Sequence, residues 1–199
     1  MNQTDLLLAS SSPYRKQLLD RLGLPFRCQS PEIDEQPRPG EDPTALAVRL
    51  ATEKARALAP ENPDSLIIGS DQVATLPDNT LLGKPGNHEQ ARKQLAASSG
   101  QCVRFLTGLA VFDARTNTLK TRCESFSAQF RDLSDTEIEY YLKKEQPYDC
   151  AGSFKMEGLG IALFEALEGR DPNSLVGLPL IALIDVLKEF GINPLTQER

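Results

Sequence analysis

The sequence predicts an α/β protein, because short apolar runs alternate along the chain with amphipathic stretches of helical spacing. Some of these stretches begin at residues that favour helix starts, as in Ser12-Pro13 and Asp42-Pro43. Neither an internal repeat nor a low-complexity linker divides the 199 residues. We therefore expect a single domain over residues 1–199, with strands and helices interleaved.

Strands are expected where apolar residues form short runs. These runs lie at residues 6–9, 26–30, 65–70, 102–112 and 119–130. The polar stretch 113–118 indicates a hairpin between the last two runs. Asp71 follows the third run directly, so the sequence places it just beyond the end of a buried strand.

Helices are expected in the amphipathic stretches. They lie at residues 13–22, 43–59, 88–99, 135–145 and 179–190. Asn87 is a suitable N-cap for the third helix, and Ser134 with Glu137 forms a capping-box pattern at the fourth. The proline-rich, acidic segment 31–42 is expected to be a loop, and the glycine-rich segment 150–169 carries no predicted element.

Composition and charge exclude several classes of protein. The 28 acidic and 22 basic residues give a net charge of −6, which argues against a dedicated nucleic-acid-binding protein. No apolar run approaches the roughly 18 residues of a membrane span, and the N-terminus lacks the charged start of a secretory signal. The four cysteines form no CxxC and there is one histidine, so a closed zinc site is not expected. We expect reduced thiols and a cytoplasmic location.

The segment after the first strand has residue types that bind phosphate. Ser10, Ser11 and Ser12 supply hydroxyls at a helix N-terminus, whose free N–H groups attract anions. Arg15 adds a planar positive charge. The alternative is a serine-capped helix with a solvated arginine.

Asp71 is a candidate for acid–base chemistry. Ligands of open α/β sheets bind at the carboxyl ends of strands. A carboxylate there can orient a water molecule as a general base or hold a divalent metal. The alternative is an aspartate that starts a turn.

Two lysines and an acidic loop add further charge. Lys84 lies between a glycine and a proline, and Lys54 lies in a predicted helix, but each could equally be solvated. The P-loop pattern GxxxxGK[ST] is absent, which argues against a conventional ATPase. Glu32, Asp34 and Glu35 can collect Mg²⁺ or Mn²⁺, and the alternative is a solvated acidic loop.

The last two segments carry weaker signals. In residues 150–158, small residues let the backbone approach a ligand, so that Ser153 and Lys155 could address phosphate and Glu157 could face what lies beyond. Residues 173–180 are expected to form a tight turn before the last helix, with a structural role.

Taken together and in this order, these segments resemble the Maf family of nucleoside triphosphate pyrophosphatases. The ordered set SSSP-x-R, EKA, GSDQV, GKP, AGSF-K-x-EG and VGLPL carries the resemblance, which runs from residue 6 to about residue 193. It implies an elongated mixed sheet with flanking helices and two lobes around a cleft, related to inosine triphosphate pyrophosphatases. It also implies hydrolysis of a nucleoside triphosphate between the α- and β-phosphates, assisted by Mg²⁺ or Mn²⁺. Within the family, the sequence is most similar to the branch that hydrolyses 7-methyl-GTP.

The resemblance also implies roles for individual residues. The general base falls on Asp71. From the chemistry of the carboxylates themselves, Asp71 and Glu35 are the expected metal ligands. The phosphate-binding and further cleft positions fall on Ser10, Arg15, Lys54, Lys84 and Glu32. The positions that sort substrates fall on Tyr14, Gln72 and Glu157. They differ from the arginine, threonine and glutamine of the pyrimidine-preferring branch. Tyr14 also replaces the tryptophan expected in the methyl-GTP branch, but it keeps an aromatic face.

Two other functions stay open. One is a pyrophosphatase that cleaves other non-standard or ordinary nucleotides as house-cleaning, and the other is a non-catalytic regulator of cell division. The presence of Asp71, Lys54 and Lys84 together argues against the second. Because His88 lies at a predicted helix start, no serine–histidine pair is available, and attack by water is expected. The sequence is compatible with a homodimer, and neither nucleic acid nor a membrane is an expected partner.

Overall fold

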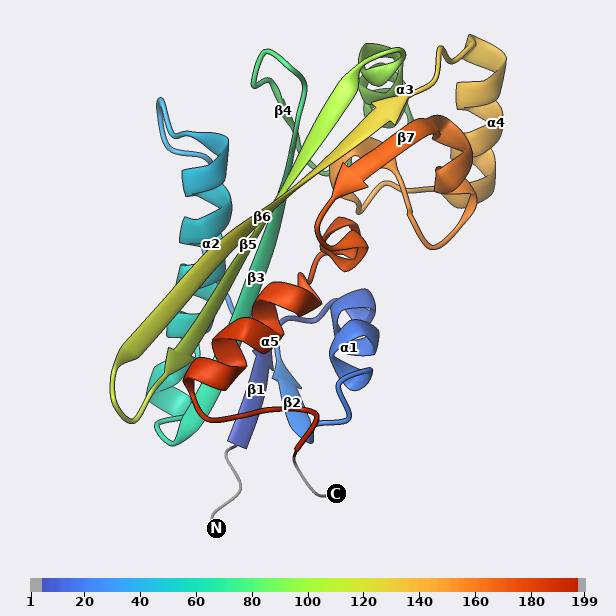
Figure 1. The fold of residues 1–199 in the computed structure, drawn as a ribbon. Coiled ribbons are helices and arrows are strands. Elements are labelled where there is room, and N and C mark those ends of the chain that lie inside the picture. Colours follow the sequence, from blue (N-terminus) through green and yellow to red (C-terminus); the bar gives the residue numbers. More distant parts are fainter. Residues whose placement is uncertain (1–4, 197–199) are drawn as a thin grey trace.

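The computed structural model describes residues 5–196, which form an open mixed sheet flanked by helices (Figure 1). The strands are β1 (Asp5–Ala9), β2 (Phe26–Gln29), β3 (Ser65–Thr75), β4 (Leu81–Leu82), β5 (Cys102–Asp113), β6 (Thr118–Phe130) and β7 (Phe164–Gly169). Their order in the seven-stranded sheet is β2-β1-β3-β5-β6-β7, and β4 pairs with β3. β1 is parallel to both β2 and β3, whereas all other pairings are antiparallel. The predicted α/β class is confirmed.

The helices begin where the sequence predicts them. They are α1 (Pro13–Asp20), α2 (Pro43–Ala57), α3 (His88–Ser98), α4 (Asp135–Glu145) and α5 (Leu180–Glu189), with the short 3₁₀ segments η1 (Ala59–Glu61), η2 (Ala151–Ser153), η3 (Leu159–Leu163) and η4 (Pro172–Val176). Ser12 caps α1, Asp42 caps α2, and Ser134 and Glu137 form the predicted capping box. Of the helices in the described part of the chain, none combines the length and the apolar character needed to cross a membrane.

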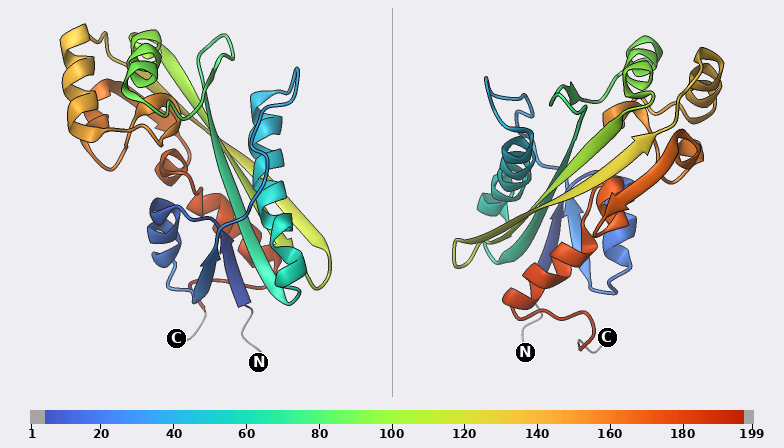
Figure 2. Two further views of the ribbon diagram at one scale, coloured as in Figure 1. Left: turned by 180° about the vertical axis from the view of Figure 1, so that it is seen from behind. Right: turned by 45° about the horizontal axis from the view of Figure 1, so that its top comes forward.

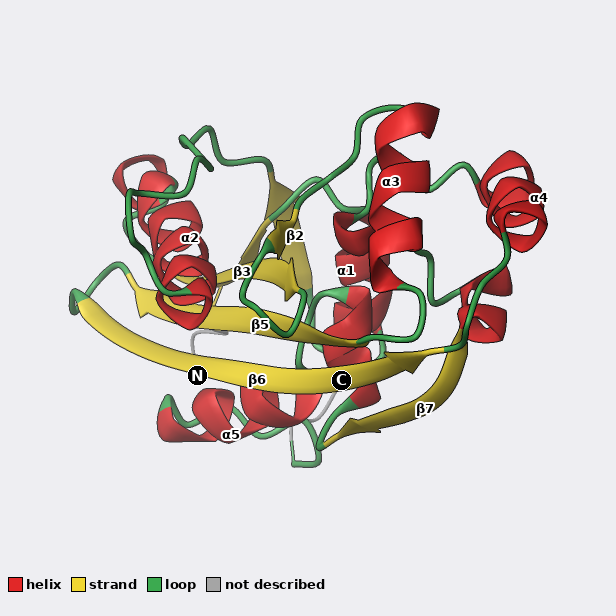
Figure 3. Ribbon diagram, turned by 90° about the horizontal axis from the view of Figure 1, so that it is seen from above, coloured by secondary structure: helices red, strands yellow, loops and turns green. Residues whose placement is uncertain are grey.

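The strands β1 and β3 are covered on both faces. Because successive side chains of a strand point to opposite sides of a sheet, Leu6 and Leu8 pack with α1 and α5, whereas Leu7 and Ala9 pack with α2. Seen from above, α2 and α5 lie on opposite sides of β5 and β6 (Figure 3). Burial on both faces explains why β1 is a continuous apolar run rather than an alternating one.

A second group of elements packs on the long strands β3, β5 and β6, at the end of these strands that lies away from β1, α1 and α5. There α3, α4 and β7 gather, away from α1 and α5 (Figures 1 and 2). The core of this group contains edge-to-face aromatic pairs, with ring centroids 4.9 Å apart for Phe105 and Phe154 and 4.8 Å apart for Phe130 and Phe164. The elements thus form two lobes at the two ends of the long strands.

The helix α2 lies directly against β3 and β5, because glycines in the strands face small residues on the helix. A Cβ atom at Gly69 would overlap the carbonyl oxygen of Ala51, and one at Gly108 would overlap that of Ala47. Only a residue without a side chain fits at such a close approach. The contact brings the last turn of α2, which carries Lys54, against the middle of β3.

Asp71 lies inside β3 and not beyond its end, which corrects the prediction. The strand continues to Thr75 because its antiparallel pairing with β5 runs without a break through these polar residues. On the other edge of β3, the pairing with β1 stops at Ile68 and the pairing with β4 starts at Ala74. Within residues 5–196, the edge of β3 at residues 69–73 therefore has no partner strand. This gap is flanked by the end of β1 and by the loop after β4.

Two short strands, β4 and β7, are not predicted from the sequence pattern. β7 lies within the glycine-rich segment 150–169 and pairs with β6. Most of its side chains are exposed, so its apolar residues form no recognisable run. Pairing of its backbone with β6, and not local hydrophobicity, makes this segment a strand.

Candidate functional site

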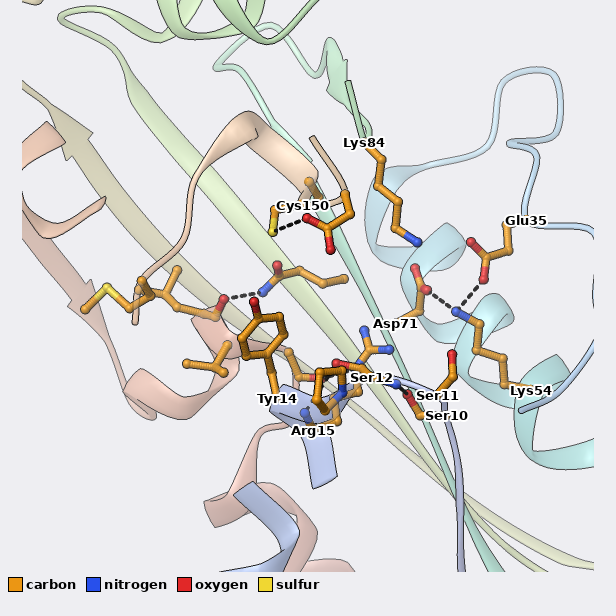
Figure 4. Close-up of a pocket in the computed structure, with 18 of the residues that line it drawn as sticks. Ser10, Ser11, Ser12, Tyr14, Arg15, Glu35, Lys54, Asp71, Lys84 and Cys150 are labelled. Carbon is orange, nitrogen blue, oxygen red and sulfur yellow. Dashed lines mark hydrogen bonds and ion pairs between the residues drawn. The ribbon is translucent and has the colours of Figure 1, made fainter. Parts of the chain in front are cut away.

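A cavity of about 400 Å³ opens at the gap along β3 (Figure 4). Its walls come from the end of β1 and the start of α1, the loop before α2, the last turn of α2, the loop after β4, and the segments around η2 and η4. These segments meet because β1 ends beside the middle of the longer β3. The cavity thus lies at the carboxyl end of a parallel strand, where α/β proteins commonly bind ligands.

The cavity gathers most of the residues that the sequence singled out. Those that line it are Ser10, Tyr14, Arg15, Glu35, Lys54, Asp71, Gln72, Lys84 and Glu157. Four others do not line it: Glu32, Asp34, Ser153 and Lys155. Glu32 and Asp34 are exposed, Ser153 is buried and donates to Gln94, and Lys155 Nζ donates to the carbonyl oxygen of Glu145 at 3.0 Å, so the last two do not address a phosphate here. The loop before α2 reaches the site through an ion pair between Glu35 and Lys54, so Glu35 is the member of the acidic cluster that enters the wall.

Lys54 lies between two carboxylates at the centre of the site. Its Nζ donates to Asp71 Oδ1 at 2.6 Å and pairs with Glu35 Oε1 at 2.7 Å (Figure 4). Lys54 and Asp71 are buried, whereas the Glu35 side chain is half exposed. Burial raises the pKa of Glu35, but the hydrogen bond from Lys54 and the charges of Lys54, Lys84 and Arg15 outweigh it and lower that pKa.

Arg15 joins α1 to the opposite wall of the cavity. Its Nε donates to the carbonyl oxygen of Gly177 at 2.7 Å. Burial lowers the pKa of Arg15, and the charges of Asp71 and Glu35 oppose this effect. Within the described residues, its two Nη nitrogens make no hydrogen bond. They are therefore free to donate to an anion in the cavity.

The turn after β1 has the form that the serines predicted. Ser12 Oγ accepts from the backbone N–H of Arg15, and Ser10 Oγ accepts from that of Ser12. The serine turn thus has both roles that the sequence allowed. It caps α1, and Ser10, Ser12 and Arg15 all line the cavity.

Gln72 faces the other side of β3 from Asp71. Its Nε2 donates to the carbonyl oxygens of Ser174 at 2.7 Å and Leu175 at 3.1 Å, so Oε1 is left as its acceptor group. The segment 173–180 was expected to be structural, and it does hold this side chain in place. The carbonyl oxygen of Gly177, in the same segment, accepts from Ser70 Oγ as well as from Arg15.

Asp149, just before η2, lines the wall but was not singled out from the sequence, and its neighbour Cys150 entered only as the first residue of the segment 150–158. The Cys150 thiol donates to Asp149 Oδ1 at 3.4 Å. Burial, followed by the charge of Asp149, raises the pKa of Cys150 to about 12. This thiol is therefore protonated at neutral pH and is not an activated nucleophile. The signal that could have found Asp149 is its position directly before the segment 150–158.

The carboxylates of the site fit a divalent metal of the magnesium type. Among residues 5–196, no group of three or more histidine, cysteine, aspartate or glutamate side chains could hold a metal ion. Asp71 and Glu35 offer hard oxygen donors on either side of Lys54. Two carboxylates together with substrate phosphates and water are a usual ligand set for Mg²⁺, so the donor chemistry is suitable.

The sequence was also compared with known proteins. It is 57% identical over 188 residues to the 7-methyl-GTP pyrophosphatase of Pseudomonas syringae pv. tomato, which covers 94% of this chain and 97% of that protein. It is 58% identical over 192 residues to the 7-methyl-GTP pyrophosphatase of Chromohalobacter salexigens, covering 96% and 99%. The family model described as Maf-like protein matches residues 5–190. This chain therefore belongs to the Maf family.

Proposed function

We propose that this protein hydrolyses 7-methyl-GTP to 7-methyl-GMP and pyrophosphate. The observation that carries the proposal is that one cavity combines three cations, Arg15, Lys54 and Lys84, with the ring of Tyr14 and the carboxylate of Glu157. Tyr14 lies across the cavity from Lys54 and Lys84 (Figure 4). A nucleotide can thus place its triphosphate against the cations and its base against Tyr14. The names of the two relatives support this substrate.

Asp71 is the proposed general base. Lys54 engages Oδ1, and within the described part of the chain Oδ2 makes no hydrogen bond. Oδ2 can therefore take a proton from a water molecule as that water attacks the α-phosphorus. The bond from the α-phosphorus to the bridging oxygen breaks, and pyrophosphate leaves with the electron pair. A covalent intermediate is not required, since the Cys150 thiol is protonated and His88 does not line the cavity.

The cations of the site stabilise the charge of the reacting phosphates. Arg15 can donate through both Nη nitrogens, and Lys84 is exposed in the cavity wall and lowers the pKa of Glu35 by its charge. Preorganised positive groups of this kind supply most of the catalysis in phosphoryl transfer. Asp71 and Glu35 are the residues proposed to hold Mg²⁺ or Mn²⁺, which would supply further charge neutralisation.

The side of the cavity that carries Tyr14 and Glu157 has groups that suit a methylated guanine. Methylation at N7 places a positive charge on the ring, which an aromatic face such as that of Tyr14 attracts. The carboxylate of Glu157 adds attraction that a neutral side chain cannot supply. Gln72 Oε1 is available to accept a hydrogen bond from a base edge, because Nε2 is held by the wall.

Pyrophosphate release from a panel of nucleotides tests the proposal. The purified protein is given 7-methyl-GTP, GTP, ITP and UTP with Mg²⁺, with Mn²⁺ or with EDTA. We expect the highest kcat/KM for 7-methyl-GTP, with pyrophosphate as the product and loss of activity in EDTA. In ¹⁸O-labelled water, the label should appear in 7-methyl-GMP, since the attack is on the α-phosphorus.

The other outcomes of this panel identify the alternatives. A higher kcat/KM for ITP or UTP would support the house-cleaning pyrophosphatase. Release of orthophosphate would place the cleavage elsewhere in the triphosphate. No product from any nucleotide would support the non-catalytic regulator. A homodimer and a cytoplasmic location stay predictions, the second supported by the four free thiols.

A further inference from the structure

The loop that carries Lys84 is held by its backbone. The Lys84 side chain makes no ion pair with any described residue, so the backbone must determine where its charge lies. Gln94 on α3 donates from Nε2 to the carbonyl oxygen of Gly83 at 3.0 Å. The N–H of Gly86 donates to the carbonyl oxygen of Tyr148 at 2.9 Å. Lys84 therefore lies between two glycines whose backbone groups are held by hydrogen bonds to other parts of the fold.

The same Gln94 amide also holds the turn of residues 150–157. This turn leads to Glu157 and is called the base-side turn, because Glu157 is one of the groups proposed to contact the base. Its Oε1 accepts from Ser153 Oγ at 2.5 Å. Ser153 is completely buried and has a φ of +59°, a left-handed conformation that is costly for a residue with a side chain. The hydrogen bond to Gln94 satisfies a hydroxyl that would otherwise be buried without an acceptor.

Ser153 ends η2 and lies next to residues of the cavity wall. Cys150 and Ala151 precede it, and Phe154 and Glu157 follow it, and all four line the cavity. Gln94 does not line the cavity. Gln94, which lies outside the cavity, thus joins the loop that carries Lys84 to the turn that carries Glu157.

We propose that Gln94 is a positioning residue that sets the separation between Lys84 and the base-side turn of residues 150–157. A nucleotide touches both walls at once, so its phosphorus atoms are aligned with Asp71 only if the two walls keep their spacing. Displacements of about 1 Å can cost a large part of the rate in such sites. The inference relies on the proposed function for the identity of the substrate, whereas the link itself is a property of the fold.

Variants that cut the link on either side test the inference. Ser153→Ala removes the bond to Gln94 and keeps the bond to Gly83, whereas Gln94→Met removes both with little change of volume. Gln90→Met is the matched control, because Gln90 is exposed on the same helix and its side chain makes no hydrogen bond with a described residue. Ser153→Gly replaces Ser153→Ala if that variant does not fold, since glycine accepts a positive φ.

Two measurements are made on the full chain. The first is amide hydrogen exchange of the peptide that contains residues 83–87, with which Ser153 makes no hydrogen bond in the described part of the chain. We expect severalfold faster exchange in Ser153→Ala and in Gln94→Met, and parent-like exchange in Gln90→Met. The second is kcat/KM for 7-methyl-GTP, which should fall about three- to tenfold in each link variant, the effect of one hydrogen bond. The double variant should be no worse than Gln94→Met alone, because the bond is already absent.

Unchanged exchange at residues 83–87 in Ser153→Ala, or losses that add up in the double variant, would overturn the positioning role. A parent protein that cleaves no nucleotide, while Ser153→Ala still speeds exchange, would overturn the proposed function and support the link. The two failures are therefore separable.

Discussion

Lys54 Nζ lies 2.6 Å from Asp71 Oδ1, and this contact joins the last turn of α2 to the middle of β3. The two side chains are 9% and 11% exposed, so the pair is largely shielded from water. The helix can lie this close because Gly69 leaves room for the Ala51 carbonyl. The pair thus depends on the packing of the helix against the sheet, and it directs one oxygen of Asp71 to the lysine and leaves the other for water.

We expect Asp71→Asn to keep the fold and lose most of the activity. The amide has the shape of the carboxylate, and its oxygen can still accept from Lys54, but it cannot take a proton from water. Loss of a general base typically lowers the rate by about 10² to 10⁴. The measurement is kcat for 7-methyl-GTP with saturating metal. Asp64→Asn, an exposed aspartate just before β3, is the control, and a near-normal kcat in Asp71→Asn would show that another group is the base.

Lys54→Met should destabilise the protein as well as inactivate it. It leaves the largely buried Asp71 carboxylate without its partner, and breaking a buried pair from one side typically costs about 3–5 kcal/mol. Because Asp71 is partly solvated, we expect the lower end of that range in urea unfolding. The double variant Lys54→Met with Asp71→Asn should regain part of the stability. A double variant as unstable as the sum of the two single variants would mean that the pair does not interact in this way.

Arg15→Ala and Lys84→Ala should differ in their effect on stability. Both remove a cation from the cavity, so each should lower kcat/KM by about 10- to 100-fold, the effect of a charge-assisted hydrogen bond. Only Arg15 also binds the wall, through Gly177. We therefore expect a lower Tm for Arg15→Ala and a parent-like Tm for Lys84→Ala. Parent-like kcat/KM in Lys84→Ala would make Lys84 a solvated surface residue.

Glu157→Gln and Tyr14→Ala should reduce the preference for the methylated base. Both groups interact with a positive charge that GTP lacks on its ring. For Tyr14→Ala, which removes a cation–π contact worth about 0.5–2 kcal/mol, the ratio of kcat/KM for 7-methyl-GTP to that for GTP should fall by roughly 2- to 30-fold. Glu157→Gln should lower the ratio in the same direction, because it removes a coulombic attraction to the charged ring. The measurement is this ratio in the parent and in each variant. An equal loss for both nucleotides would mean that these residues position the loop or the triphosphate instead.

Glu35 should make a small contribution to stability that is lost in acid. Its pKa in the folded protein is lower than the ordinary value of 4.5, so the unfolded chain takes up a proton first as the pH falls. The contribution is complete above pH 4.5 and disappears as the pH falls through the pKa of the folded state. Urea unfolding from pH 7 to pH 3 should show a shallower acid slope for Glu35→Gln than for the parent. The same slope in both would mean that Lys54 does not lower this pKa.

The sequence by itself determined the class of the fold, the starts of the helices and most of the candidate site. Ser12 and the Ser134–Glu137 pair mark helix starts through local hydrogen bonds, which depend only on neighbouring residues. The short ordered segments also carried the resemblance to the Maf family. It indicated Asp71, Lys54 and other residues that line the cavity.

The tertiary structure alone decided where these segments meet. Asp71 lies within β3 because pairing with β5 continues through it. The cavity exists because, along the other edge of β3, pairing with β1 stops at Ile68 and pairing with β4 starts only at Ala74. The entry of Glu35 instead of Glu32 depends on its pairing with Lys54, 19 residues along the chain. The link from Gln94 to Ser153 joins residues that are 59 positions apart. Local propensity acts over a few residues, whereas strand pairing and buried hydrogen bonds join distant segments. No pattern within a single segment specifies them.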